Sequence, residues 1–153
     1  MKVLRGRSGF SLIELLIVIA VIAFLSALSV PSLFRFLAKS KRSEAYMTLR
    51  SLYLAEKSYW AEHGTYTNVL QGQNSLGWKP EGVLQYTYGF PGAEGTNFVT
   101  GALKGANAAL TGNANAQSFT ASAVGDIDGD GDPDILTIDQ NGTITLVKDD
   151  LAT

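Results

Sequence analysis

The chain has 153 residues, a formal net charge of −2 and no cysteine. This length fits one domain plus a terminal segment, and the lack of cysteine excludes disulfides, thiol catalysis and Cys-ligated metal sites. Nine of the twelve basic residues lie at or before Lys57, whereas all eight Asp residues lie in the last 28 positions. No basic surface is therefore expected beyond the N-terminal half, and a specific nucleic-acid partner is not predicted.

The N-terminus combines a basic leader with a long apolar segment. Residues 1–9 carry three basic side chains, and residues 10–30 carry a single charge, that of Glu14. Twenty-one helical residues span about 31 Å, which matches the hydrocarbon core of a bilayer. We therefore predict a transmembrane helix over residues 10–30, a pattern that an ordinary signal anchor would also produce.

Two residues are not explained by a simple anchor. A carboxylate such as that of Glu14 costs a few kcal/mol inside a lipid-facing helix, so it indicates a function. Gly9 ends the basic leader and is followed by Phe10-Ser11-Leu12-Ile13-Glu14. A short basic leader ending in Gly, then this string, then a long apolar helix resembles the type IV pilin and pseudopilin family.

The resemblance implies how such a chain is processed. A prepilin peptidase/methyltransferase in the membrane would cut between Gly9 and Phe10, and Phe10 would become the N-methylated first residue. Glu14 would then pair with the Phe10 amine of a neighbouring subunit. That pairing removes the cost of a lone buried carboxylate and fixes the register of the polymer.

The resemblance also implies partners and a location. The partners are other copies of the chain in a helical homopolymer, the membrane and an inner-membrane assembly platform. The subunit would lie in the inner membrane before assembly and then in an extracellular pilus, or in a periplasmic pseudopilus.

Residues 31–63 continue the helical pattern with an amphipathic face. Pro31 lacks an N–H and predicts a kink or local melting of the helix. Gly64 is a helix stop signal, so we predict one long helix over residues 10–63. An apolar stripe at spacings of three, four and seven indicates that the second half packs under a sheet. Its members are Tyr46, Leu49, Tyr53 and Trp60, and Ala45, Leu52 and Tyr59 form an adjacent stripe that widens the apolar face.

Residues 64–153 predict a globular β domain. Asn141-Gly142 is a strong hairpin signal, and Gly101–Gln117 is rich in Ala, Gly and Asn, which predicts a mobile surface loop. The predicted fold class is α+β, with the long helix packed against an antiparallel sheet of about four strands. The predicted strands are Leu84–Phe90, Ser118–Val124, Asp134–Asp139 and Thr143–Lys148.

An Asp-rich segment, Gly125–Asp134, is the candidate metal site. Oxygen ligands at alternate positions with Gly at the sixth match the Ca²⁺ loop template. Thr137 stands where an EF-hand has its bidentate Glu, and no helix is expected beside the loop, so it departs from the EF-hand. The alternative is a solvated acidic turn. The predicted calcium ligands are the side chains of Asp126, Asp128, Asp130 and Asp134 and the carbonyl of Asp132.

No nucleophile motif, phosphate-binding loop or paired catalytic carboxylates occur outside the Asp-rich segment, so an enzyme is not expected. The leading hypothesis is a structural subunit of a type IV pilus. The alternatives are a pseudopilin of a type II secretion system and a non-polymerising, membrane-tethered calcium-binding domain. The final hairpin, Ile135–Val147, resembles pilins of environmental Gram-negative bacteria, which favours the pilus.

Overall fold

A computed structural model describes residues 9–103 and 109–152, apart from the side chains of Pro31 and Phe34. Except for Gly9, the predicted leader therefore lies outside the described residues. The chain forms two compact units, Met1–Phe36 and Leu37–Thr153.

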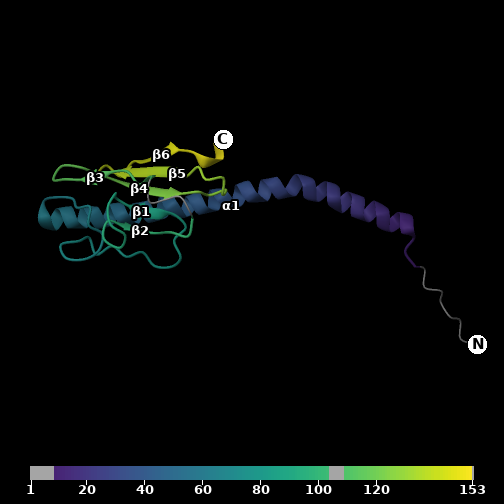
Figure 1. The fold of residues 1–153 in the computed structure, drawn as a ribbon, viewed down its shortest axis with the longest axis horizontal. Helices are drawn as coiled ribbons and strands as arrows, with labels where there is room; N and C mark the ends of the chain where they lie inside the picture. Colours follow the sequence, from purple (N-terminus) through teal and green to yellow (C-terminus); the bar gives the residue numbers. More distant parts are fainter. Residues whose placement is uncertain (1–8, 104–108, 153) are drawn as a thin grey trace, which may run out of the picture. The chain divides into compact units, whose positions relative to one another are not determined.

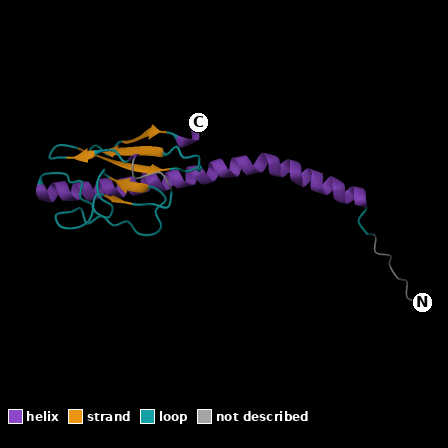
Figure 2. Ribbon diagram, in the orientation of Figure 1, coloured by secondary structure: helices purple, strands orange, loops and turns teal. Residues whose placement is uncertain are grey.

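Helix α1, Leu12–His63, supplies the described helical part of the first unit and continues into the second (Figures 1 and 2). By length and composition it is the one described helix that could cross a membrane, and its most apolar stretch is entirely unburied. The backbone stays helical through Pro31, so the local melting is not seen, and a kink there stays a prediction. The helix ends as predicted, because Gly64 follows with a φ of 70° and donates its N–H to the Trp60 carbonyl (2.8 Å).

The second unit contains an antiparallel sheet in the order β2-β1-β4-β5-β6, with β3 paired to β4 (Figure 1). Its strands are β1 (Thr87–Gly89), β2 (Phe98–Val99), β3 (Asn113–Ala114), β4 (Phe119–Gly125), β5 (Asp134–Asp139) and β6 (Ile144–Lys148). A 3-10 turn, η2 (Asp150–Ala152), follows β6. The predicted antiparallel α+β fold is confirmed.

The strand predictions need two corrections. The first predicted strand is real only at Thr87–Gly89, and two further two-residue strands, β2 and β3, were not predicted. β3 lies in the segment predicted as a loop, part of which (104–108) is outside the described residues. Two residues are too few to show the alternation that marks a strand, so only pairing with β1 and β4 reveals them.

The core lies between the second half of α1 and the sheet. Ala45, Leu49 and Leu52 are fully buried in one cluster with side chains such as Tyr86 and Phe119. The buried row combines Ala45 and Leu52 of one predicted stripe with Leu49 of the adjacent predicted stripe, that of Tyr46, Tyr53 and Trp60. Of that stripe Leu49 is buried, whereas Tyr46 and Trp60 are 38% and 44% exposed.

The hairpin between β5 and β6 forms as its sequence predicts. Gly142 has a φ of 76° and donates its N–H to the Asp139 carbonyl at 2.9 Å. The Asp139 carboxylate accepts the N–H groups of Asn141 and Thr143, both at 2.9 Å. These contacts fix the register that carries the chain on toward η2.

Candidate functional site

Two regions carry the predicted site residues, and the first is the start of α1. Ser11 precedes the helix and acts as its N-cap, because its Oγ accepts the Glu14 N–H at 3.2 Å. Ser11 and Glu14 have the spacing of a capping box, which is a local reason for an acid at this position. Phe10 is 77% exposed just outside the helix.

The side chains of this helix start have little to contact within the first unit. Glu14 is exposed, and no ion pair involves it within the described ranges. A Cβ added to Gly9 would meet nothing within 4 Å, so packing does not require glycine there. The following residues are exposed large hydrophobics, including Leu12, Ile13 and Leu16. This segment is an apolar helix with one carboxylate near its N-terminus, and water is a poor environment for it.

The second region is the loop between β4 and β5. The Asp126 carboxylate accepts the N–H of Gly129 at 2.6 Å and that of Gly131 at 3.0 Å. Both glycines have positive φ, 91° and 97°, which L side chains rarely adopt. The alternating sequence of acids and glycines therefore winds the loop tightly around Asp126.

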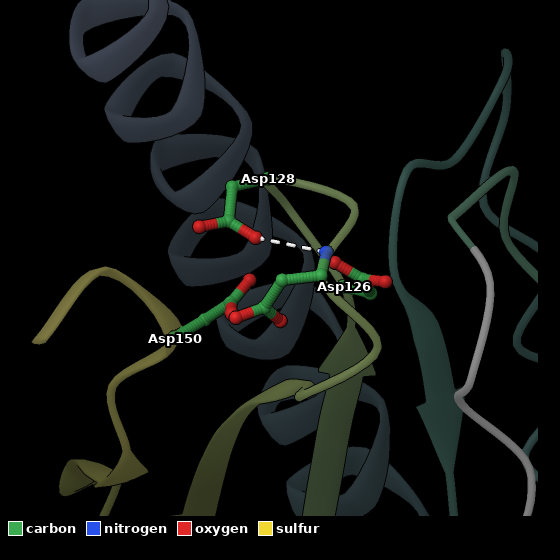
Figure 3. A group of neighbouring side chains, drawn as sticks. Asp126, Asp128 and Asp150 are labelled. Atoms are coloured by element: carbon green, nitrogen blue, oxygen red, sulfur yellow. Dashed lines mark hydrogen bonds between the residues drawn. The ribbon is translucent and has the colours of Figure 1, made fainter. Parts of the chain in front are cut away.

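This winding collects four carboxylates, those of Asp126, Asp128, Asp130 and Asp150. One oxygen of each lies within 4.8 Å of the others, so the group could hold a metal ion. Figure 3 shows Asp126 and Asp128 from the loop and Asp150 from the C-terminal segment facing one another. Carboxylate oxygens are the ligands that hard cations prefer.

Asp150 closes the group from outside the loop. It is 1% exposed and its Oδ2 accepts the Ile127 N–H at 2.8 Å. Burial raises the pKa of Asp150, and the nearby charges of Asp128 and Asp130 add to this. Because these neighbours are acids, a cation placed among them would relieve their mutual repulsion.

Two of the predicted ligands lie in other contacts. Asp134 is fully buried and accepts two hydrogen bonds from Arg42 (2.8 and 2.9 Å) and one from the Tyr86 hydroxyl (2.8 Å). Asp132 pairs with Lys148 at 2.5 Å. The structure therefore groups the carboxylates of Asp126, Asp128 and Asp130, adds that of Asp150, and places Asp134 in other contacts, whereas a ligand role for the Asp132 carbonyl stays a prediction.

Two basic residues of α1 contact the loop and the C-terminal segment. Lys41 donates to the Ile127 carbonyl at 2.9 Å, and Arg42 bridges from Asp134 to Asp149 at 2.5 Å. The hydrogen bond from Arg42 lowers the pKa of Asp149. Sequence reasoning missed Asp150, and its only signal was the acidic pair Asp149-Asp150 directly after the last strand.

Comparison with known protein families finds one match at each of the two regions. Residues 4–30 match the prokaryotic N-terminal methylation motif, and residues 118–147, from β4 into β6, match the FG-GAP repeat. The first match covers the Gly9–Phe10 junction and Glu14, and the second contains the acidic loop.

Three curated proteins are similar to the chain. The type IV major pilin protein PilA of Myxococcus xanthus is 42% identical over 91 residues, 60% of this chain and 40% of that protein. The type IV wide pilus major component PilA4 of Thermus thermophilus is 36% identical over 78 residues, 50% of this chain and 58% of the relative. The fimbrial protein EcpC of Eikenella corrodens is 37% identical over 60 residues, 39% of each chain.

The chain thus spans between about two fifths and three fifths of the length of these relatives. The methylation motif and the relatives both indicate a type IV pilin. The long helix packed on an antiparallel sheet is the fold that was predicted. The chain is similar to type IV pilins and carries the N-terminal methylation motif over residues 4–30.

Proposed function

We propose that the chain is a structural subunit of a type IV pilus. It is cut between Gly9 and Phe10 by a prepilin peptidase, methylated at Phe10, and polymerised through the first half of α1. The single observation that carries this proposal is the methylation motif over residues 4–30, which covers the Gly9–Phe10 junction and the start of α1, a helix with no buried residue in its most apolar stretch. Two similar proteins are named as major pilus components, which favours an abundant subunit.

The location follows from the exposed surface of the helix. Apolar side chains from Leu12 to Val30 are stable in lipid or against other apolar helices, and unstable in water. The subunit is therefore located in the inner membrane before assembly, where its partner is an assembly platform. It is then incorporated into an extracellular pilus, a polymer of many copies.

Glu14 selects the neighbouring copy. Its carboxylate is exposed on an apolar helix and has no ion pair within the described part of the chain. Cutting at Gly9 creates a cationic amine on Phe10, four positions before Glu14. In the polymer the Phe10 amine of one copy compensates the Glu14 carboxylate of the next, and a misplaced copy leaves both charges unpaired.

Mass spectrometry of the chain recovered from sheared cell-surface filaments tests the proposal. We expect a chain that starts at Phe10 and carries one methyl group on its amine. A chain that starts at Met1, or cleavage at another bond, contradicts the proposal. Electron microscopy of the same material is expected to show abundant filaments labelled by antibody to this chain, whereas labelled membranes without filaments would favour a simple tether.

We further propose that the ion held by the four clustered aspartates is Ca²⁺. Asp126, Asp128 and Asp130 supply alternate oxygen ligands with Gly131 at the sixth position, as calcium loops require. Asp150 adds a fourth carboxylate from a separate segment, which suits the larger coordination number of Ca²⁺ better than the octahedral shell of Mg²⁺. The ion would tie the C-terminal segment to the loop in a domain that has no disulfide.

A further inference from the structure

Glu56 is a carboxylate in the buried row of α1. It follows Leu52 by one helical turn, and both side chains are 0% exposed. Its Oε2 accepts one long hydrogen bond, from the Thr67 N–H at 3.3 Å. Its Oε1 has no hydrogen-bond partner within the described residues. A buried carboxylate with one weak donor is costly in its charged form.

The charged and titratable groups around Glu56 do not compensate the negative charge that its ionised carboxylate would carry. Lys57, the next residue of α1, donates instead to the Tyr66 hydroxyl at 3.0 Å. Its ammonium also lies 5.6 Å from the ring centroid of Tyr53 and 5.5 Å from that of Tyr66. On the sheet side, Tyr53 and Tyr66 pack against Phe119 of β4, which carries no charge. Burial raises the pKa of Glu56 to about 8, and only the Thr67 hydrogen bond opposes this.

The partner of Glu56 lies across the turn that ends α1. The chain leaves the helix at Gly64, and Thr67 returns to the side of Glu56, so their hydrogen bond closes this turn. The hydrogen bond from Lys57 to the Tyr66 hydroxyl is a second link between the helix and this turn. Tyr66 also donates its N–H to the Asn115 carbonyl at 3.1 Å, which connects the turn to the segment between β3 and β4.

We propose that Glu56 is a proton-linked latch on the turn that follows α1. As a neutral carboxylic acid it keeps residues 64–67 against the helix, and opening of the turn exposes the carboxyl group and releases one proton. The latch is independent of the filament proposal, because it lies within the second unit and uses no residue of the N-terminal segment.

The direction of the pH effect follows from proton linkage. Exposed in the open turn, Glu56 has its ordinary pKa of 4.5, whereas closed it has a pKa of about 8. Between these values the open form has lost the proton and the closed form has kept it. The equilibrium therefore moves toward opening by about tenfold per pH unit, and it levels off above the pKa of the closed form. Acid tightens the latch and alkali loosens it.

Hydrogen exchange of the Thr67 amide in the full chain in detergent micelles tests the proposal. After correction for intrinsic exchange, we expect its protection to fall by about tenfold per pH unit between pH 5.5 and 7.5 in the wild type. In Glu56→Gln, which keeps the shape and an acceptor, protection should not vary over this range. Glu62→Gln alters an exposed acid on the same helix and should keep the wild-type slope.

A second measurement reads the proton itself. Carbon-13 labelling of glutamate carboxyl groups should give one resonance that is absent in Glu56→Gln and titrates near pH 8. The proposal is overturned if that resonance is already ionised at pH 6. It is equally overturned if the protection of Thr67 has the same pH dependence in the wild type and in Glu56→Gln.

Discussion

The acidic side chains of this protein are stabilised in four different ways. Asp134 is buried and compensated by Arg42 and Tyr86. Asp126 accepts backbone N–H groups. Glu56 is buried and held neutral by its raised pKa of about 8. Glu14 is exposed among apolar neighbours, and under the proposed function its charge is compensated by a neighbouring subunit.

Replacing Glu14 by Ala should therefore leave the subunit intact and impair assembly. The variant is expected to be cut and methylated at Phe10, since the junction is unchanged. Its filament yield should fall by tenfold or more, because losing one partner of a desolvated charge pair costs about 3–5 kcal/mol. Immunoblots of sheared filaments and of whole cells measure both quantities.

Glu62→Ala is the matched control, because this acid is exposed on the second half of the same helix. It should give wild-type filament yield. A Glu14→Ala variant that assembles normally would contradict the assembly role of the residue.

Individual residues were predictable from the sequence where the chemistry is local. The spacing of Asp126, Asp128 and Asp130 was sufficient to predict that they gather, because the loop between them has few residues. The compensation of Asp134 was not predictable, since Arg42 lies 92 positions earlier in the chain. The contribution of Asp150 likewise depends on where β6 delivers the C-terminal segment.

Helix α1 has an unpartnered face in the second unit as well as in the first. Met47 and Leu54 are 74% and 65% exposed and lie seven residues apart, on the side away from the buried row. The intervening Ser51 and the following Ser58 are small and exposed. In a filament whose core is made of helices, this face would continue the apolar contact surface.

Leu54→Glu tests the role of this face. The carboxylate is tolerated in the free subunit, because the position is exposed to water. In the assembled helix core it would be desolvated at a cost of a few kcal/mol, so we expect about a tenfold or larger loss of filaments with unchanged thermal stability. Filament yield and the melting temperature of the detergent-solubilised subunit are the measurements.

Val83→Glu is the control for this change. Val83 is 80% exposed and lies in a loop before β1, so the same charge there should leave filaments unaffected. Equal losses in the two variants would contradict a specific role for the helix face.

Elements were predictable in proportion to their length. Helix α1 differs from the prediction by two residues at its start, and β5 has the predicted bounds. β2 and β3 were missed, because two residues cannot display a periodicity. The two stripes predicted on α1 contain the buried Ala45, Leu49 and Leu52, whereas the larger Tyr46 and Trp60 of the same face remain partly exposed.

At the scale of the whole second unit, the acidic loop joins three parts of the chain. α1 reaches the loop through Lys41, β5 begins at its end with Asp134, and η2 enters it with Asp150. A cation among the clustered carboxylates would therefore stabilise the entire unit and not only the loop.

Chelation should lower the melting temperature of the detergent-solubilised chain. With calcium at about a hundred times its dissociation constant, binding adds about 2.7 kcal/mol, which corresponds to a shift of several degrees. Asp150→Asn should abolish most of this calcium response, whereas Asp132→Asn should preserve it, since Asp132 pairs with Lys148.

Differential scanning calorimetry with and without chelator measures the response, and Glu81→Gln, in an exposed loop, is the control. An unchanged melting temperature in chelator would contradict the calcium proposal. A calcium response lost in Asp132→Asn but kept in Asp150→Asn would contradict the ligand set.

The entry of Asp150 into the acidic loop makes the integrity of the globular unit depend on the short segment that follows β6. A chain that stops after β6 lacks the acceptor for the Ile127 N–H and the second carboxylate that binds Arg42. Prematurely terminated products therefore cannot complete the unit and are the ones that quality-control proteases should remove.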